Sequence, residues 1–119
     1  MTPAEAMERL NVVLAHAWMV RAFLKHADEV QDHAEIQEVH RTIYDAIRAV
    51  EPAYQSQEAV EYLHRLRSKL PKLRKTAEYF AAEYRNVSDH TNFEMAARSL
   101  SGCVRLLEEI LAEVQAPAP

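Results

Sequence analysis

An unbroken apolar stripe between residues 63 and 87 is the strongest constraint on how this chain can fold. Apolar side chains recur there at spacings of three and four, which is the period of one face of an α-helix and not that of a strand. The stripe consists of Leu63, Leu66, Leu70, Leu73, Ala77, Phe80, Tyr84 and Val87. The pattern predicts one long helix, kinked at Pro71 because a proline inside a helix cannot donate the usual backbone hydrogen bond.

Three further stripes of the same period lie on either side of this one. They are Leu10, Val13, Ala17, Val20, Leu24 and Ala27; His33, Ile36, His40, Ile43, Ile47 and Val50; and Phe93, Ala96, Leu100, Cys103, Leu107, Ile110 and Val114. The segments between the stripes are short, and short connections make successive helices antiparallel. We therefore expect an all-α fold, a single antiparallel up-down-up-down four-helix bundle over residues 1–115, followed by a disordered Pro/Ala tail at 116–119.

Residues that favour helix ends mark where each helix is expected to start and stop. Thr2 and Asp32 are each followed three residues later by glutamate, the capping-box pattern. The expected caps are Thr2, Asp32, Ser56 and either Ser88 or Thr91. The second helix is expected to end at Glu51-Pro52, because proline disfavours a helical conformation in the residue before it.

Composition supports a helical fold and narrows the classes of function. Gly102 is the only glycine in 119 residues, and a chain poor in residues that tolerate positive φ favours long helices with few turns. The net charge of -4 argues against a protein that mainly coats nucleic acid. Nucleic acid is therefore possible as a partner but is not favoured. Cys103 is the only cysteine, which favours a reducing compartment and hence the cytoplasm. The longest run without charged residues, Leu10 to Val20, is too short to span a membrane.

The first expected helix carries a second apolar stripe besides the one that faces the core. It consists of Val12, His16, Met19, Phe23 and His26. A helix in a monomeric bundle normally buries one stripe and exposes the remainder to solvent. Either this helix has a wide buried face, or its second stripe contacts another chain. We favour a non-enzymatic module, without a cofactor, that forms a homodimer or docks on another protein through this helix.

A basic stretch, Arg65–Lys75, contains six positive charges and no acidic residue. Such a run is typical of a site for an anion or a nucleic acid. An internal explanation is also available. If the last two helices pair antiparallel about a turn near residue 89, residues 66–71 lie level with residues 108–113. The acids Glu108, Glu109 and Glu113 lie at that level. We favour the interpretation that the basic stretch pairs with these acids on the neighbouring helix.

Histidines from three expected helix ends share one pole of the bundle. They are His26, His33 and His90, and several carboxylates are nearby in the sequence. Imidazole and carboxylate groups are ligands for zinc, iron, nickel and copper, so a metal-binding bundle is an alternative function. A solvated polar cap would use the same residues. His40 is different, because it lies within an apolar stripe and is expected to be a core histidine whose neutral form is favoured by burial.

Residues 85–90, Arg-Asn-Val-Ser-Asp-His, have the arginine-polar-x-x-x-histidine form of the motif in HEPN-type ribonuclease domains. The chain resembles that family in these six residues and in its expected size and helical fold, although the aromatic residue that often follows is replaced by Asn92. The resemblance implies a metal-independent ribonuclease, usually dimeric. His90 would act as general acid or base on the ribose 2′-hydroxyl, Arg85 would stabilise the phosphorane charge, and Asn86 would orient the phosphate. The alternative is a structural role, because these residue types are also common at a helix end and in a turn.

Overall fold

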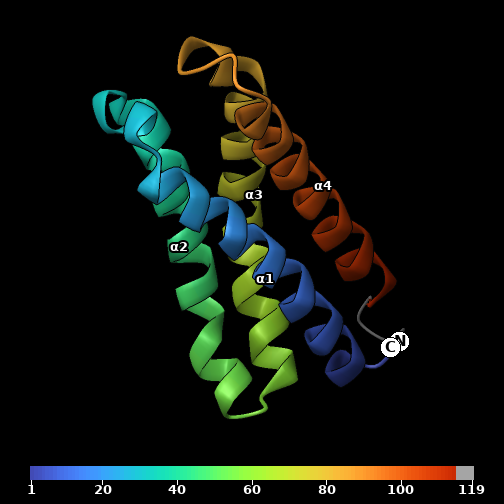
Figure 1. Ribbon diagram of the computed structural model, residues 1–119. Coiled ribbons are helices and arrows are strands. Elements are labelled where there is room, and N and C mark those ends of the chain that lie inside the picture. Colours follow the sequence, from blue (N-terminus) through green and yellow to red (C-terminus); the bar gives the residue numbers. More distant parts are fainter. Residues whose placement is uncertain (115–119) are drawn as a thin grey trace.

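The computed structural model describes residues 1–114, which form four long helices and two short 3-10 segments. The elements are α1 (Pro3–His26), η1 (Asp28–Asp32), α2 (Ala34–Gln55), α3 (Ala59–Glu83), η2 (Tyr84–Asn86) and α4 (Thr91–Glu113). Successive helices run in opposite directions (Figure 1). The predicted all-α, antiparallel four-helix bundle is thus confirmed. The predicted tail at 116–119 lies outside the described residues.

Each helix packs against two neighbours, and one diagonal pair also meets. α1 and α3 each contact both α2 and α4, and they also contact each other across the bundle. The resulting molecule is elongated, measuring 49 × 23 × 18 Å along its principal axes. None of the helices in residues 1–114 is long and apolar enough to cross a membrane.

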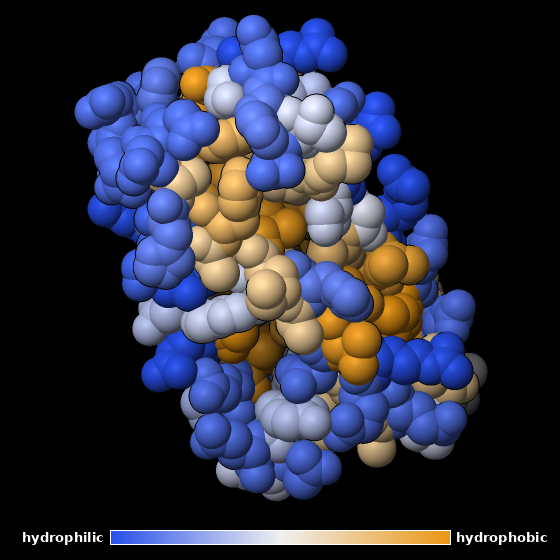
Figure 2. Space-filling view, in the orientation of Figure 1, coloured by the Kyte–Doolittle hydropathy of each residue, from blue (hydrophilic) through white to orange (hydrophobic). Residues whose placement is uncertain are grey.

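The four predicted stripes supply most of the core. Its largest fully buried side chains include Tyr62, Phe80, Phe93, Met7, Leu10 and Leu24. The core stripe of α2 departs from the prediction, because His40 and Ile47 are only half-buried while Val39 and Ala46 are buried instead. The face that α2 buries is therefore rotated slightly from the predicted stripe. Apolar residues also remain visible across the middle of the face shown in Figure 2, where polar residues surround them.

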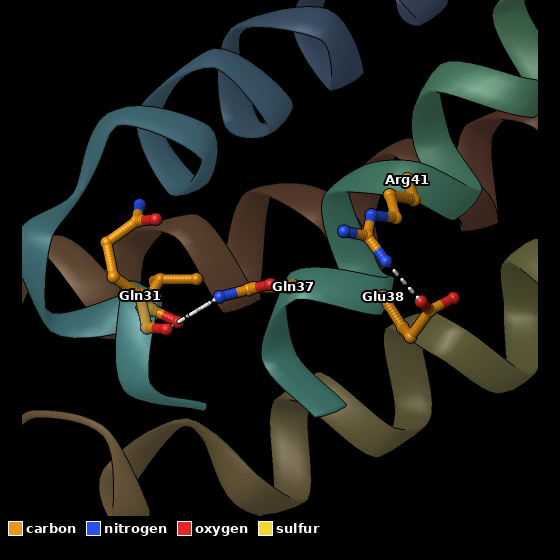
Figure 3. A network of polar contacts seen from close by, with 5 residues as sticks. Gln31, Gln37, Glu38 and Arg41 are labelled. Atoms are coloured by element: carbon orange, nitrogen blue, oxygen red, sulfur yellow. Dashed lines mark hydrogen bonds and ion pairs between the residues drawn. The ribbon is translucent and has the colours of Figure 1, made fainter. Parts of the chain in front are cut away.

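The start of α1 follows the prediction, and the start of α2 does not. Thr2 Oγ1 accepts a hydrogen bond from the Glu5 amide at 3.1 Å, and the Glu5 carboxylate accepts one from the Thr2 amide. The predicted cap at Asp32 is wrong, because η1 continues through Asp32 and His33 takes the cap position without a side-chain hydrogen bond. Gln37 closes this connection by donating to the Gln31 carbonyl at 2.8 Å (Figure 3).

Two further predicted helix ends are wrong. α2 continues through Pro52 to Gln55, because Ala53 is buried in the core and holds the last turn in place. Ser56 ends α2 and does not cap α3, whose cap position is occupied by Glu58. α3 runs on through Pro71 as a single helix.

The connection into α4 uses a histidine as its cap. The expected cap was Ser88 or Thr91, but His90 holds the cap position, and its Nδ1 accepts a hydrogen bond from the Asn92 amide at 3.0 Å. Ser88 supports this turn, since its hydroxyl accepts from the His90 amide at 3.0 Å.

Candidate interaction surface

The outer face of α1 exposes large apolar side chains to solvent. Val12 is 60% exposed and Met19 is 66% exposed, because both lie on the side of the helix opposite the buried stripe. They are seven residues apart, so two turns of the helix place them on the same side. His16, between them, is exposed as well. This part of the second stripe is therefore outside the core.

A hollow lies beside these residues in the groove between α1 and α2. It has a volume of about 470 Å³ and is lined by Asn11, Leu14, Ala15, His16, Trp18, Met19 and Ile47. All but Ile47 belong to α1, and most of the lining side chains are apolar. α1 thus presents an apolar ridge, formed by Val12 and Met19, next to a mainly apolar hollow. We call this combination the α1 surface.

Trp18 is held at the edge of the hollow by a stack of arginine and aromatic groups. The Arg21 guanidinium lies 4.2 Å from the centre of the Trp18 ring and 4.8 Å from that of Tyr44. Arg21 Nε is buried and has no hydrogen-bond partner, so the aromatic faces are its main compensation. Tyr44 comes from α2, so the stack joins α1 to α2.

Polar contacts fix α1 to α2 and α3. The buried Tyr62 hydroxyl donates to Asn11 Oδ1 at 3.1 Å, and the Tyr54 hydroxyl donates to the Glu8 carboxylate at 3.1 Å. Burial raises the pKa of Tyr62 well above its ordinary value, and the hydrogen bond to Glu8 raises the pKa of Tyr54. Both phenols therefore remain neutral donors, and the α1 surface is held in a defined position.

The two remaining residues of the second stripe have different surroundings. Phe23 is half-buried, and its ring centre lies 5.1 Å from that of Phe93 in an edge-to-face arrangement. Phe23 therefore packs at the edge of the core. His26 is exposed at the last residue of α1.

His40 lies half-buried on α2, close to cations from α1. Burial lowers the pKa of His40, and the positive charges of Arg41, Arg21 and Lys25 lower it further, against a smaller opposing effect of Glu38. The expected neutral histidine thus has a physical basis, although the side chain lies at the margin of the core and not within it.

The pH dependence of folding should show this effect. The pKa of His40 in the folded protein lies below its ordinary value of 6.5, so the unfolded chain takes up the proton first as the pH falls. Its contribution to stability is fully present above about pH 6.5 and is lost as the pH falls towards the folded pKa. Urea unfolding at several pH values should give a shallower acid-side slope for His40→Gln than for the original protein. Parallel curves would contradict this assignment.

The three histidines considered as metal ligands do not form one group. Within residues 1–114, no three His, Cys, Asp or Glu side chains come close enough to hold a metal ion together. His26 ends α1, His33 precedes α2, and His90 uses its Nδ1 in capping α4. Sharing a pole of the bundle does not bring these side chains together.

The three residues of the ribonuclease-like segment also have separate surroundings. Arg85 lines a hollow against α4, whereas Asn86 donates a hydrogen bond to Glu83. The Nδ1 lone pair of His90 is used by the Asn92 amide, so this nitrogen is unavailable as a base unless the cap is lost. The observed contacts thus match those of helix-end and turn residues.

The basic stretch makes contacts within the bundle. Arg74 pairs with Glu108, and Arg67 donates to the Val114 carbonyl at 2.7 Å, near the end of α4. Both contacts agree with the predicted antiparallel register of the last two helices. Glu109 and Glu113 form no ion pair within the described part of the chain. The internal match therefore rests on Glu108 and on the backbone carbonyls of α4.

The fold and the α1 surface define the chain as a small antiparallel four-helix bundle with an apolar outer helix face. Comparison with protein-family models, with curated proteins and with solved structures gave no significant match.

Proposed function

We propose that this protein is a non-enzymatic helical module that forms a homodimer through the α1 surface. The observation that carries the proposal is the solvent exposure of Val12 and Met19, at 60% and 66%, beside an apolar hollow. Exposing such groups on one face of a helix is unfavourable unless another surface covers them. The single cysteine, Cys103, is a buried free thiol, which suits our proposal that the homodimer forms in the cytoplasm.

A second copy of the chain fits the α1 surface because that surface is self-complementary. Val12 and Met19 lie the same number of residues on either side of the point between Ala15 and His16, so a two-fold axis there would set the ridge of each copy against the ridge of the other. In this arrangement Val12 of each copy faces Met19 of the second copy. Both ridges would be covered at once.

The spacing of residues along α1 favours a helix as the partner. Val12, Met19 and His26 are each seven residues apart, and Ala15 and Ala22 repeat at the same interval between them. A seven-residue repeat with two positions facing the partner is the pattern of paired helices. The small alanines at the second position allow the two helices to approach closely.

The charges at the two ends of α1 favour an antiparallel pair. Glu5 and Glu8 are exposed near its start beside a single base, Arg9, whereas Lys25 and His26 are exposed at its end. Antiparallel pairing about the proposed two-fold axis brings the acidic end of each copy towards the basic end of the other. A parallel pair would instead place like charges together, which costs free energy.

The native mass of the protein in solution tests the proposal most directly. Light scattering coupled to size-exclusion chromatography should give twice the chain mass of 13.7 kDa at micromolar concentration. The dimer should be retained in moderate salt, because its contact is mainly apolar. A mass of one chain across the accessible concentration range would reject self-association.

A further inference from the structure

A second hollow lies on a different face of the bundle, between the end of α3 and the middle of α4. It has a volume of about 490 Å³, and its lining residues are Ala81, Tyr84, Arg85, Glu94, Ala97, Arg98, Ser101, Gly102 and Arg105. This volume falls within the range of pockets that hold small organic molecules. None of these residues belongs to α1, so the hollow is independent of the proposed dimer contact.

The lining of this hollow is strongly cationic within an acidic protein. Arg85, Arg98 and Arg105 contribute three guanidinium groups, and Glu94 is the only carboxylate in the lining, although the chain as a whole has a net charge of -4. Arg98 contacts Glu94 at 3.3 Å. Within residues 1–114, Arg85 and Arg105 form no ion pair with a carboxylate.

The charges of Glu94 and Asp89 attract Arg85 without forming an ion pair with it, so its guanidinium group is compensated only in part. Arg85 donates to the neutral Tyr84 hydroxyl at 3.3 Å, which does not cancel its charge. Arg85 and Arg105 lie on different elements and line the same hollow from η2 and from α4. Guanidinium groups that line one hollow can donate hydrogen bonds to several oxygens of a phosphate group.

The only glycine of the chain lies in the lining of this hollow. Gly102 is in the interior of α4, where glycine is the least favourable residue after proline. Neither packing nor backbone conformation requires it, because a Cβ atom at this position would meet nothing within 4 Å and the residue has no positive φ. Together with Ala97 and Ser101, Gly102 keeps the surface of α4 low between the arginines, which leaves room for the body of a ligand.

We propose that the α3–α4 hollow binds a small organic phosphate. Arg85, Arg98 and Arg105 hold the phosphate oxygens, and the organic part lies over Ala97, Ser101 and Gly102. The hollow is larger than a phosphate ion requires, so contacts with the organic part add to the affinity. Glu94 lies on the same rim and repels a phosphate placed on its side of the hollow.

Isothermal titration calorimetry with ADP, pyrophosphate and inorganic phosphate tests this assignment on the intact protein. ADP should bind at one site per chain and at least fivefold more tightly than inorganic phosphate, with an affinity that falls as salt is added. Arg98→Gln and Arg105→Gln should each weaken ADP binding at least tenfold. Lys69→Gln removes the same charge from an exposed position on α3 outside the hollow and should change the affinity less than twofold.

Filling the hollow without changing its charge provides an independent test. Gly102→Leu places a side chain in open space on a helix that leucine favours, so the protein should be at least as stable as before while ADP binding is lost. Circular dichroism would verify that each variant retains its helical structure. The proposal is overturned if none of the three anions binds at millimolar concentration, if inorganic phosphate binds as tightly as ADP, or if Lys69→Gln weakens binding as much as Arg105→Gln.

Discussion

Changing Met19 to glutamate should convert the proposed dimer into a monomer while leaving the helical circular dichroism unchanged. Met19 is 66% exposed on α1, so the isolated chain can accommodate a charge there without disturbing its core. In the dimer, two new carboxylates would be buried in an apolar contact, which is costly because neither has a partner. We expect the dimer dissociation constant to rise about 100-fold or more, equivalent to about 2.8 kcal/mol.

A matched control separates an effect of the α1 surface from a general effect of added charge. Leu106 on α4 is 48% exposed, and Leu106→Glu adds the same carboxylate on another helix. This variant should remain dimeric. If Met19→Glu keeps its fold and stays dimeric, the α1 surface is not the contact, and if both variants dissociate equally, the contact is not specific to α1.

The largest expected loss of stability comes from replacing Phe93 with alanine. Phe93 is 1% exposed at the start of α4, and its ring packs edge to face with that of Phe23 on α1. Removing the ring leaves a cavity that the ends of two helices cannot easily fill. We expect the free energy of unfolding in urea to fall by about 3–5 kcal/mol, a large share of the roughly 5–15 kcal/mol typical of a domain.

Met95 provides the control for this prediction, because it lies two residues away on the same helix and is 45% exposed. Met95→Ala should change the free energy of unfolding by no more than about 0.5 kcal/mol. A loss below about 1 kcal/mol for Phe93→Ala would show that the ring contributes little to the packing of α1 against α4.

The four helices could be predicted because their signal is local and repeated many times. Leu63, Leu66, Leu70 and Leu73 are all buried in α3, as their spacing predicted. Burial of a whole stripe outweighs any single residue, so the helices formed even where individual positions disagreed. Pro52 illustrates this, because α2 continues through it to place Ala53 in the core.

Helix ends were predicted less well, because several residues near each end can satisfy the same backbone groups. Asp32 has the chemistry of a cap, yet η1 continues through it and Gln37 closes the connection from within α2. His90 acts as a cap although its sequence context suggested Ser88 or Thr91. Which candidate residue becomes the cap depends on where the core holds the helix, and no local sequence pattern encodes that position.

The candidate sites depended on tertiary structure to different degrees. The second stripe of α1 was visible in the sequence, and the structure placed Val12 and Met19 in solvent but Phe23 against Phe93. The α3–α4 hollow had no sequence signal, since Arg85 and Arg105 are twenty residues apart and belong to different elements.

The sequence by itself determined that this chain forms four antiparallel amphipathic helices, the first of which carries a second apolar stripe. Each helix stripe has a period that its own residues define, and short connections dictate direction. Only the tertiary structure decided which part of the α1 stripe is covered, how Arg21 stacks between Trp18 and Tyr44, and which arginines share a hollow. These features depend on how far each helix is rotated and shifted against its neighbours, and that position results from the packing of all four helices together.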